Sequence, residues 1–307
     1  MSLNIAIIGA GVAGVSAANA LKAHGFKVTI FEKSRGYGGR CATKRWDGHV
    51  VDHGAQYFTI RDARFRAAVE KASGESLARL QASVLDERGD ELPDSGRWFH
   101  RDGNSQLVRD LARHLDVKTE TIIVRAEGLL RRVGGAFDHV ISTAPFPQTA
   151  RLFEMDAHFD YVPNLTVLLA YRGEWLGTTR ECYAISDHSS ALAWSACENH
   201  KPGRIAADHT VMVAQMSEAF SREHLDRPPD EYAAMVRPLV EERWELPVGS
   251  YIAALGHRWR YARVLQPLQN VELPPGLHFT GDALMSSRIE DAWLAGATTI
   301  ENNILQK

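Results

Sequence analysis

The chain has 307 residues, the length of about two ordinary domains. It contains 35 Lys and Arg residues against 38 Asp and Glu residues, a formal net charge of −3, and 45% of its residues are hydrophobic. These values are typical of a globular protein and exclude a disordered, collagen-like or coiled-coil chain. Because the sequence has no basic stripe and no apolar run of about 20 residues, we expect neither a nucleic-acid partner nor a membrane span.

The cysteines and the first residues predict the compartment. Cys41, Cys182 and Cys197 show no CxxC spacing, which excludes a disulfide scaffold and a zinc-finger-type site. The sequence also has no HExxH motif and no carboxylate cluster with metal-ligand spacing. The N-terminal residues MSLNIAIIGAG lack the basic region of a signal peptide. We therefore expect a cytoplasmic protein without a metal.

The N-terminal residues predict a strand–helix–strand unit. Residues 3–8 form a short apolar run, typical of a strand buried on both faces. An alanine-rich helix is expected over 15–24, ended by Gly25, and the β-branched and aromatic residues 26–31 predict a second strand. A strand, a helix and a strand within about thirty residues indicate a parallel sheet with a right-handed crossover.

The middle of the chain has a different pattern. A helix is expected over 104–115 and a buried strand over 137–142. Further strands separated by Pro, Gly and Asp turns are expected over 164–171, 191–197, 210–217 and 251–261. They predict a second domain with a mainly antiparallel sheet and helices. The last segment, 278–303, returns to a strand, a Gly-Asp turn and an alanine-rich helix.

The turn between the first strand and the first helix carries a dinucleotide-binding motif. Gly9, Gly11 and Gly14 match GxGxxG, in which the glycines permit a tight turn, a close approach to a pyrophosphate and close helix packing. Glu32 ends the second strand 18 residues after Gly14, where a carboxylate accepts hydrogen bonds from a ribose. We expect Gly9, Gly11 and Ala13 to hold a pyrophosphate and Glu32 to hold an adenosine ribose.

Three further segments distinguish a flavin from a nicotinamide cofactor. The run Glu32–Arg40, the run Asp52–Phe58 and the triplet Thr280-Gly281-Asp282 resemble, in this order, motifs of the flavin amine oxidase superfamily. The resemblance implies non-covalent FAD, with Arg40 on the pyrophosphate, Asp282 on the ribityl chain, and the last helix pointing at the flavin. The cofactor residues that it implies are Gly9, Gly11, Ala13, Gly14, Glu32, Lys33, Gly39, Arg40, Gln56, Tyr57, Val124, Gly281, Asp282 and Ile289.

The expected fold is therefore α/β, with a discontinuous Rossmann-like FAD-binding domain. We assign residues 1–72, 98–145 and 264–307 to this domain. Residues 73–97 and 146–263 form the substrate domain.

A narrower resemblance concerns the activity. Residues 142–145, the strand 193–199 and the run His257–Ala262 (HRWRYA) resemble the renalase family, and within it a bacterial member. The resemblance implies oxidation of the 2- and 6-dihydro isomers of NAD(P), transfer of the electrons to O₂ to form H₂O₂, and return of β-NAD(P)⁺. It further implies that Asn199 and Gln215 contact the substrate. In animal renalases a histidine stands where this chain has Gln215, so the detailed substrate preference stays open.

A residue argument addresses the main alternative, an amine or polyamine oxidase. Many amine oxidases place a lysine near flavin N5, but this chain has only Lys201 and Lys307 beyond Lys118. Lys201 lies in Asn-His-Lys-Pro-Gly, a turn-like sequence for which we expect a solvated side chain. This disfavours amine oxidation, whereas a dihydropyridine already carries a transferable hydride and needs no base. A non-catalytic FAD-binding redox sensor is the second alternative.

Overall fold

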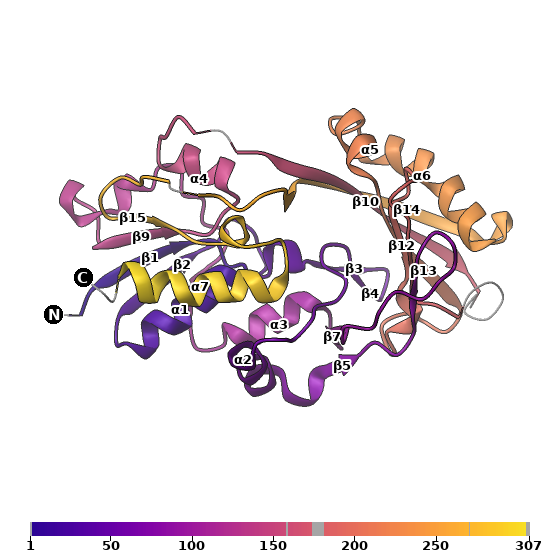
Figure 1. Ribbon diagram of the computed structural model, residues 1–307, viewed down its shortest axis with the longest axis horizontal. Coiled ribbons are helices and arrows are strands. Elements are labelled where there is room, and N and C mark those ends of the chain that lie inside the picture. Colours follow the sequence, from indigo (N-terminus) through magenta and orange to yellow (C-terminus); the bar gives the residue numbers. More distant parts are fainter. Residues whose placement is uncertain (1, 158, 174–180, 270, 305–307) are drawn as a thin grey trace.

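Two sheets lie at opposite ends of an elongated molecule in the computed structural model, which describes residues 2–157, 159–173, 181–269 and 271–304 (Figure 1). The first is a parallel sheet with helices, of the Rossmann-like kind, and the second is mainly antiparallel. The predicted fold class is confirmed. Among the described residues, no helix combines the length and the apolar composition needed to cross a membrane.

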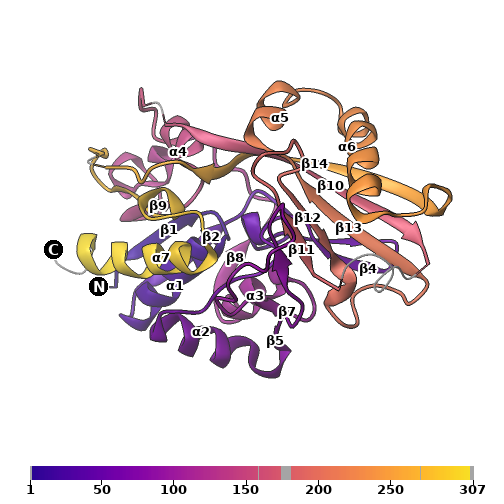
Figure 2. The same cartoon turned by 45° about the vertical axis from the view of Figure 1, so that its right-hand side comes forward.

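The parallel sheet contains both ends of the chain. Its order is β15 (Leu277–Phe279), β9 (His139–Ser142), β1 (Asn4–Ile8), β2 (Lys27–Phe31) and β8 (Asp116–Lys118). Helices α1 (Val12–Ala23) and α7 (Ile289–Asn303) pack side by side on it, as Figures 1 and 2 show. A Cβ on Gly296 of α7 would lie 2.3 Å from the carbonyl oxygen of Ala13, so only glycine permits this approach. The last helix is thereby held against the first.

The second sheet has six strands. Its order is β14 (Tyr251–Val264), β10 (Tyr161–Arg172), β13 (His209–Gln215), β12 (Trp194–Cys197), β11 (Ala184–Ser186) and β6 (Val84–Leu85). All neighbours are antiparallel except β11 and β6. Helices α5 (Glu218–Glu223) and α6 (Pro229–Trp244) lie on one face, and a core containing Leu165, Val167 and Val236 fills the interface. The other face is turned toward the parallel sheet.

Short elements connect the two sheets. They are the hairpin β3 (Thr43–Trp46) and β4 (His49–Asp52), the pair β5 (Leu77–Arg79) and β7 (Trp98–His100), and the helices α2 (Ala63–Ser73), α3 (Asn104–Leu111) and α4 (Phe146–Leu152).

Most element boundaries differ from those predicted: β10 begins at Tyr161 and not at 164, β13 ends at Gln215 and not at 217, and β14 extends to Val264 and not to 261. Helix α1 begins at Val12, inside the glycine motif, because Gly11 is already its N-cap residue. The strand predicted over 191–197 begins only at Trp194, since Asp187 accepts hydrogen bonds from the backbone of Ser189 and Ser190 and forms a turn. The helix predicted over 104–115 ends at Leu111.

Candidate functional site

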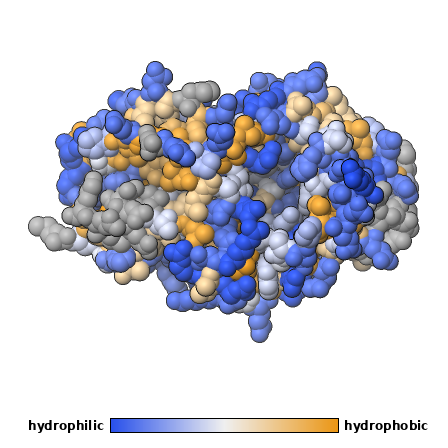
Figure 3. All heavy atoms as spheres, in the orientation of Figure 1, coloured by the Kyte–Doolittle hydropathy of each residue, from blue (hydrophilic) through white to orange (hydrophobic). Residues whose placement is uncertain are grey.

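A large cavity of about 1650 Å³ lies between the two sheets. The glycine motif, the loop after β2, the hairpin β3–β4 and the Gly-Asp turn line one side, and strands β12, β13 and β14 line the other. Figure 3 shows the surface hollowed between the two halves of the molecule, with hydrophilic side chains on the rim. The cavity therefore draws on segments from the start, the middle and the end of the chain.

The glycine motif forms an open cradle at the N-terminus of α1. A Cβ on Gly14 would lie 2.1 Å from the carbonyl oxygen of Gly9, so Gly14 serves close packing and does not line the cavity. Gly11 lines it, and no protein atom lies within 4 Å of the place of its Cβ. No side chain caps the helix N-terminus at Gly11. The first amide groups of α1 are thus available to an anion.

Glu32 lies at the end of β2, beside this cradle. Its Oε2 accepts a hydrogen bond from Ala10 N at 2.9 Å and its Oε1 accepts one from Ser34 N at 2.7 Å. The carboxylate therefore holds the glycine turn and the loop after β2 in place. It lines the cavity at the position that a ribose-binding carboxylate requires.

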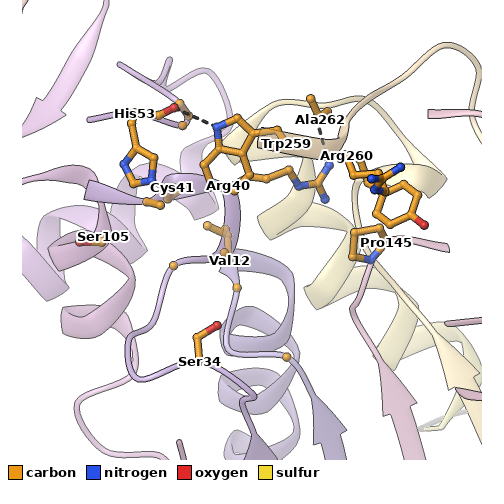
Figure 4. A pocket seen from close by; sticks show the side chains of 18 of the residues that line it. Val12, Ser34, Arg40, Cys41, His53, Ser105, Pro145, Trp259, Arg260 and Ala262 are labelled. Carbon is orange, nitrogen blue, oxygen red and sulfur yellow. Dashed lines mark hydrogen bonds between the residues drawn. The ribbon is translucent and has the colours of Figure 1, made fainter. Parts of the chain in front are cut away.

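Arg40 and Asp282 both line the cavity and are bonded to each other. Arg40 Nη1 and Nη2 lie 2.5 and 2.6 Å from the two carboxylate oxygens of Asp282, and Nη1 also donates to the carbonyl of Ala262 (Figure 4). Burial lowers the pKa of Arg40, but the carboxylate of Asp282 outweighs it and raises the pKa. We expected the two side chains to bind separate parts of FAD; the structure ties the loop after β2 to the Gly-Asp turn through them.

The segment after β4 contributes other residues to the cavity than we expected. His53, Gly54 and Ala55 line it, whereas Gln56 and Tyr57 do not. The Gln56 amide is buried: it donates to the carbonyl of Asp52 and accepts from the indole nitrogen of Trp194. Tyr57 packs against Trp194. Their side chains thus support the cavity from behind.

The expectation that Lys201 is solvated is wrong. Its side chain has no exposed surface, and its ammonium group lies 2.7 Å from Glu198 Oε1 and 3.1 Å from Asp52 Oδ2. Arg204 completes the cluster, with Nη1 at 2.6 Å from Asp52 and 3.2 Å from Glu198. A turn-like sequence gives no signal for such burial, because the second partner, Asp52, is 149 residues away in the chain. Lys201 nevertheless does not line the cavity.

Of the two expected substrate contacts, only Gln215 reaches the cavity. The amide of Asn199 is engaged by the backbone of β13: it donates to the carbonyl of His209 at 2.7 Å and accepts from Val211 N at 3.0 Å. Asn199, in the turn after β12, therefore has a structural role: it holds the start of β13. Gln215 Nε2 donates to the carbonyl of Gly54 at 3.0 Å.

The remaining expected cofactor residues lie at the cavity wall. These are Gly9, Ala13, Lys33, Gly39, Val124, Gly281 and Ile289. The sequence analysis gave no role to Trp194, although it pairs directly with Gln215 across the sheet and also lines the cavity. The sequence does not show this role, because it does not reveal the register in which β12 pairs with β13.

The cavity wall is strongly basic. Among the described residues it includes eleven Lys and Arg side chains, namely Lys33, Arg35, Arg40, Lys44, Arg45, Arg109, Arg151, Arg258, Arg260, Arg263 and Arg288. Only three carboxylates line it, those of Glu32, Glu218 and Asp282. Since the whole chain has a net charge of −3, the positive charge is local to the cavity. An anionic ligand fits such a wall. The described residues contain no group of His, Cys, Asp and Glu side chains that could hold a metal ion.

The fold and the cradle at α1 define an α/β protein of the Rossmann-like, dinucleotide-binding class. Residues 7–71 match the NAD(P)-binding Rossmann-like domain family, and residues 62–299 match the family described as flavin containing amine oxidoreductase. The second match covers most of the chain, so the protein belongs to the flavin-containing amine oxidoreductases. A flavin is the cofactor that this family implies.

Individual relatives are more distant. The chain is 34% identical over 110 residues to the phytoene desaturase of Fusarium fujikuroi, a match that spans 36% of this chain and 18% of that protein. The crystal structure of a putative protoporphyrinogen oxidase from Exiguobacterium sp. 255-15 is 16% identical, with a TM-score of 0.77 over 100% of both chains. A putrescine oxidase variant is 12% identical, with a TM-score of 0.68 over 100% of this chain and 99% of that one. These two structures establish the likeness in fold.

The residues present fit a flavin dinucleotide. The open space before Gly11 and the uncapped amides of α1 suit a pyrophosphate, and the carboxylate of Glu32 suits a ribose hydroxyl. Arg40 and Asp282 would hold the remainder of the cofactor beside the Gly-Asp turn. The flavin, when bound, supplies a hydride acceptor to the site.

Proposed function

We propose that this protein is an FAD-dependent oxidase of the 2- and 6-dihydro isomers of NAD(P). The isomer gives a hydride to the flavin, and the electrons pass to O₂. The balanced reaction converts dihydro-NAD(P), O₂ and H⁺ into β-NAD(P)⁺ and H₂O₂. The basic cavity is the observation that carries this proposal.

The charge of the wall favours a second anionic ligand beside the cofactor. Lys44 and Arg45 of β3 and Arg288 after the Gly-Asp turn line the cavity, and none of them forms an ion pair within the described part of the chain. A volume of about 1650 Å³ also exceeds the roughly 300–1,000 Å³ of a typical small-molecule site. A dinucleotide substrate supplies both the negative charge and the bulk that this space accommodates.

The titratable rings in the cavity also suit hydride transfer without a base. Burial lowers the pKa of His53 to about 3, and burial also lowers the pKa of His257. Both histidines line the cavity and stay neutral and weakly basic at pH 7. Because a dihydropyridine becomes aromatic on losing its hydride, the site has mainly to orient the ring.

The first alternative is oxidation of an amine or a polyamine. The likeness in fold to a putrescine oxidase favours it, and so does the presence of a buried lysine, which the sequence analysis did not expect. Lys201 is, however, separated from the cavity by the wall, and the basic wall repels a cationic substrate. The second alternative, a non-catalytic redox sensor, predicts a reducible flavin without turnover.

Anaerobic mixing of the flavin-loaded protein with a panel of reductants tests the proposal. The panel contains β-NADH, its 2- and 6-dihydro isomers, putrescine and a monoamine, and flavin absorbance is followed in a stopped-flow instrument. We expect rapid bleaching by the isomers and equimolar H₂O₂ after O₂ is admitted. Rapid bleaching by amines alone overturns the proposal in favour of amine oxidation, and bleaching by dithionite alone favours the sensor.

A further inference from the structure

The segment that crosses the cavity wall after β4 has an unusual hydrogen-bond pattern. Residues 52–56 form no sheet ladder after Asp52, yet each of their five consecutive backbone carbonyls accepts a hydrogen bond from a side chain. In chain order the donors are Gln56, Trp259, Gln215, Asn104 and Lys201, at 3.2, 3.0, 3.0, 2.9 and 2.7 Å. Trp259 and Gln215 come from the six-stranded sheet. Their hydrogen bonds therefore fix the orientation of these two side chains and also hold the backbone of residues 52–56 in place.

This pattern determines the orientation of the Gln215 amide. The carbonyl of Gly54 is an acceptor only, so the atom of Gln215 that faces it at 3.0 Å must be the amide nitrogen. The other end of the amide is then Oε1, an acceptor. Among the described residues none donates a hydrogen bond to this oxygen, and Gln215 is half-buried in the cavity wall.

The neighbours of Gln215 form a row across the sheet. Trp194 pairs with Gln215, Gln215 with Thr166, and Thr166 with His257, and directly paired residues project on the same face. Trp194 and His257 line the cavity on either side. The indole N–H of Trp194 donates to Gln56 Oε1 at 3.0 Å and so does not donate to Gln215 Oε1. Gln215 thus has Trp194 as its direct neighbour on one side, and Thr166 separates it from His257 on the other.

We propose that Gln215 Oε1 accepts a hydrogen bond from the carboxamide N–H of the substrate ring and so selects a carboxamide over a carboxylate. This inference rests on the proposed function. A carboxylate in the same place has no proton to donate and sets a negatively charged oxygen against Oε1. Gln215 cannot turn its amide to compensate without leaving the carbonyl of Gly54 unpaired.

The test compares two ligands that differ only in this group. NAD⁺ carries the carboxamide, and nicotinic acid adenine dinucleotide carries a carboxylate. Their Kd values are measured by calorimetry on the flavin-loaded oxidised protein, for the wild type, Gln215→Met and Gln148→Met. Methionine keeps the length of glutamine and removes its hydrogen bonds. Gln148 lines the same cavity from α4, so its variant controls for loss of an amide elsewhere.

We expect the wild type and Gln148→Met to bind NAD⁺ roughly tenfold or more tightly than the carboxylate analogue, and Gln215→Met to bind both equally. Equal binding by the wild type, a preference that survives in Gln215→Met, or binding of neither ligand overturns the inference. So does a Gln215→Met variant that changes only the Kd for FAD, since Gln215 would then contact the cofactor. The ratio of the two Kd values in the wild type is measured without any variant. It therefore still tests the inference if Gln215→Met fails to fold.

The result of this binding test can be distinguished from the result of the reductant test of the proposed function. Bleaching by the dihydro isomers together with equal binding of the two dinucleotides contradicts the role of Gln215 alone. A clear binding preference without any bleaching contradicts the oxidase proposal and leaves the carboxamide contact standing.

Discussion

Lys201 Nζ lies 3.1 Å from Asp52 Oδ2, and neither side chain has any exposed surface, although 149 residues separate them in the sequence. Burial raises the pKa of Asp52, but the charges of Lys201 and Arg204 outweigh burial and hold the pKa below its usual value. With Glu198, the cluster contains two positive and two negative groups and is neutral as a whole. It joins the end of β4 to the turn after β12, directly behind the cavity wall.

Removing Lys201 should therefore be costly. Lys201→Met leaves two buried carboxylates with Arg204 as their one cation, so one buried negative charge is uncompensated, and we expect the free energy of unfolding to fall by about 3–5 kcal/mol. Urea denaturation measures this loss. Lys71→Met, at an exposed helix position without an ion pair in the described chain, is the matched control. A loss as small as that of the control would show that the cluster contributes nothing to stability.

The flavin should be bound without a covalent link. Cys41 is a thiol at the cavity wall, and burial, the largest effect, raises its pKa to about 12, so the reactive thiolate is not formed at neutral pH. We expect acid precipitation to release all the flavin as FAD into the supernatant, with an identical result for Cys41→Ser. Colour retained in the wild-type pellet and lost in that of Cys41→Ser would contradict this prediction.

Glu32 should control the affinity for FAD. A hydrogen bond between a carboxylate and a sugar hydroxyl contributes about 1.5–3 kcal/mol, so Glu32→Ala should raise the Kd for FAD by roughly 10- to 100-fold. Titration of the flavin-free protein, followed by quenching of flavin fluorescence, measures this change. Part of this loss arises because Glu32→Ala leaves the backbone amides of Ala10 and Ser34 without their acceptor. Glu32→Gln keeps an acceptor, so its Kd for FAD should lie between the Kd values of the wild type and Glu32→Ala. An unchanged Kd would place the ribose elsewhere.

The buried His53 should make the protein sensitive to acid. Its pKa of about 3 in the folded protein lies below the roughly 6.5 of an unfolded histidine, so between these values the unfolded state binds more protons. This contribution to stability is complete above pH 6.5 and is lost as the pH falls toward 3, by at most about 1.4 kcal/mol per pH unit. Urea denaturation at several pH values should show that the free energy of unfolding falls less steeply with decreasing pH in His53→Phe than in the wild type. The exposed His114→Gln serves as control, and an equal slope in all three proteins would refute the assignment.

Salt should weaken binding of the dinucleotide substrate. Added ions screen the basic wall over about 10 Å at 0.1 M, so KM for the dihydro isomers should rise several-fold between low and physiological ionic strength while kcat changes little. Lys44→Ala should raise KM at low salt and reduce the salt dependence. Lys71→Ala, remote from the cavity wall, should do neither. A KM that falls as salt is added would indicate a cationic substrate and support the amine oxidase alternative.

The local elements were predictable because their signals are local. The strand–helix–strand unit, the glycine motif and Glu32 depend on apolar runs, on Gly9, Gly11 and Gly14, and on one spacing, all within the first 32 residues. The structure reproduces them, with α1 beginning at Val12 because the second glycine serves as its N-cap. Four strands of the second sheet, β10, β12, β13 and β14, followed from β-branched runs between turns, although with shifted boundaries, whereas the short strands β11 and β6 were not predicted.

The amino-acid sequence by itself thus determined the class of protein, a Rossmann-like dinucleotide-binding fold with a second sheet, and the residues that form the cradle at α1. Only the tertiary structure decided which polar groups are buried. Lys201 stands in a turn-like sequence, but Asp52 and Glu198 supply two negative charges that compensate its burial, and Asn199 is turned away from the cavity by the backbone of β13. The physical reason is that burial of this charge also requires Asp52, which is 149 residues from Lys201 in the sequence, and no local pattern of residues encodes such a partner.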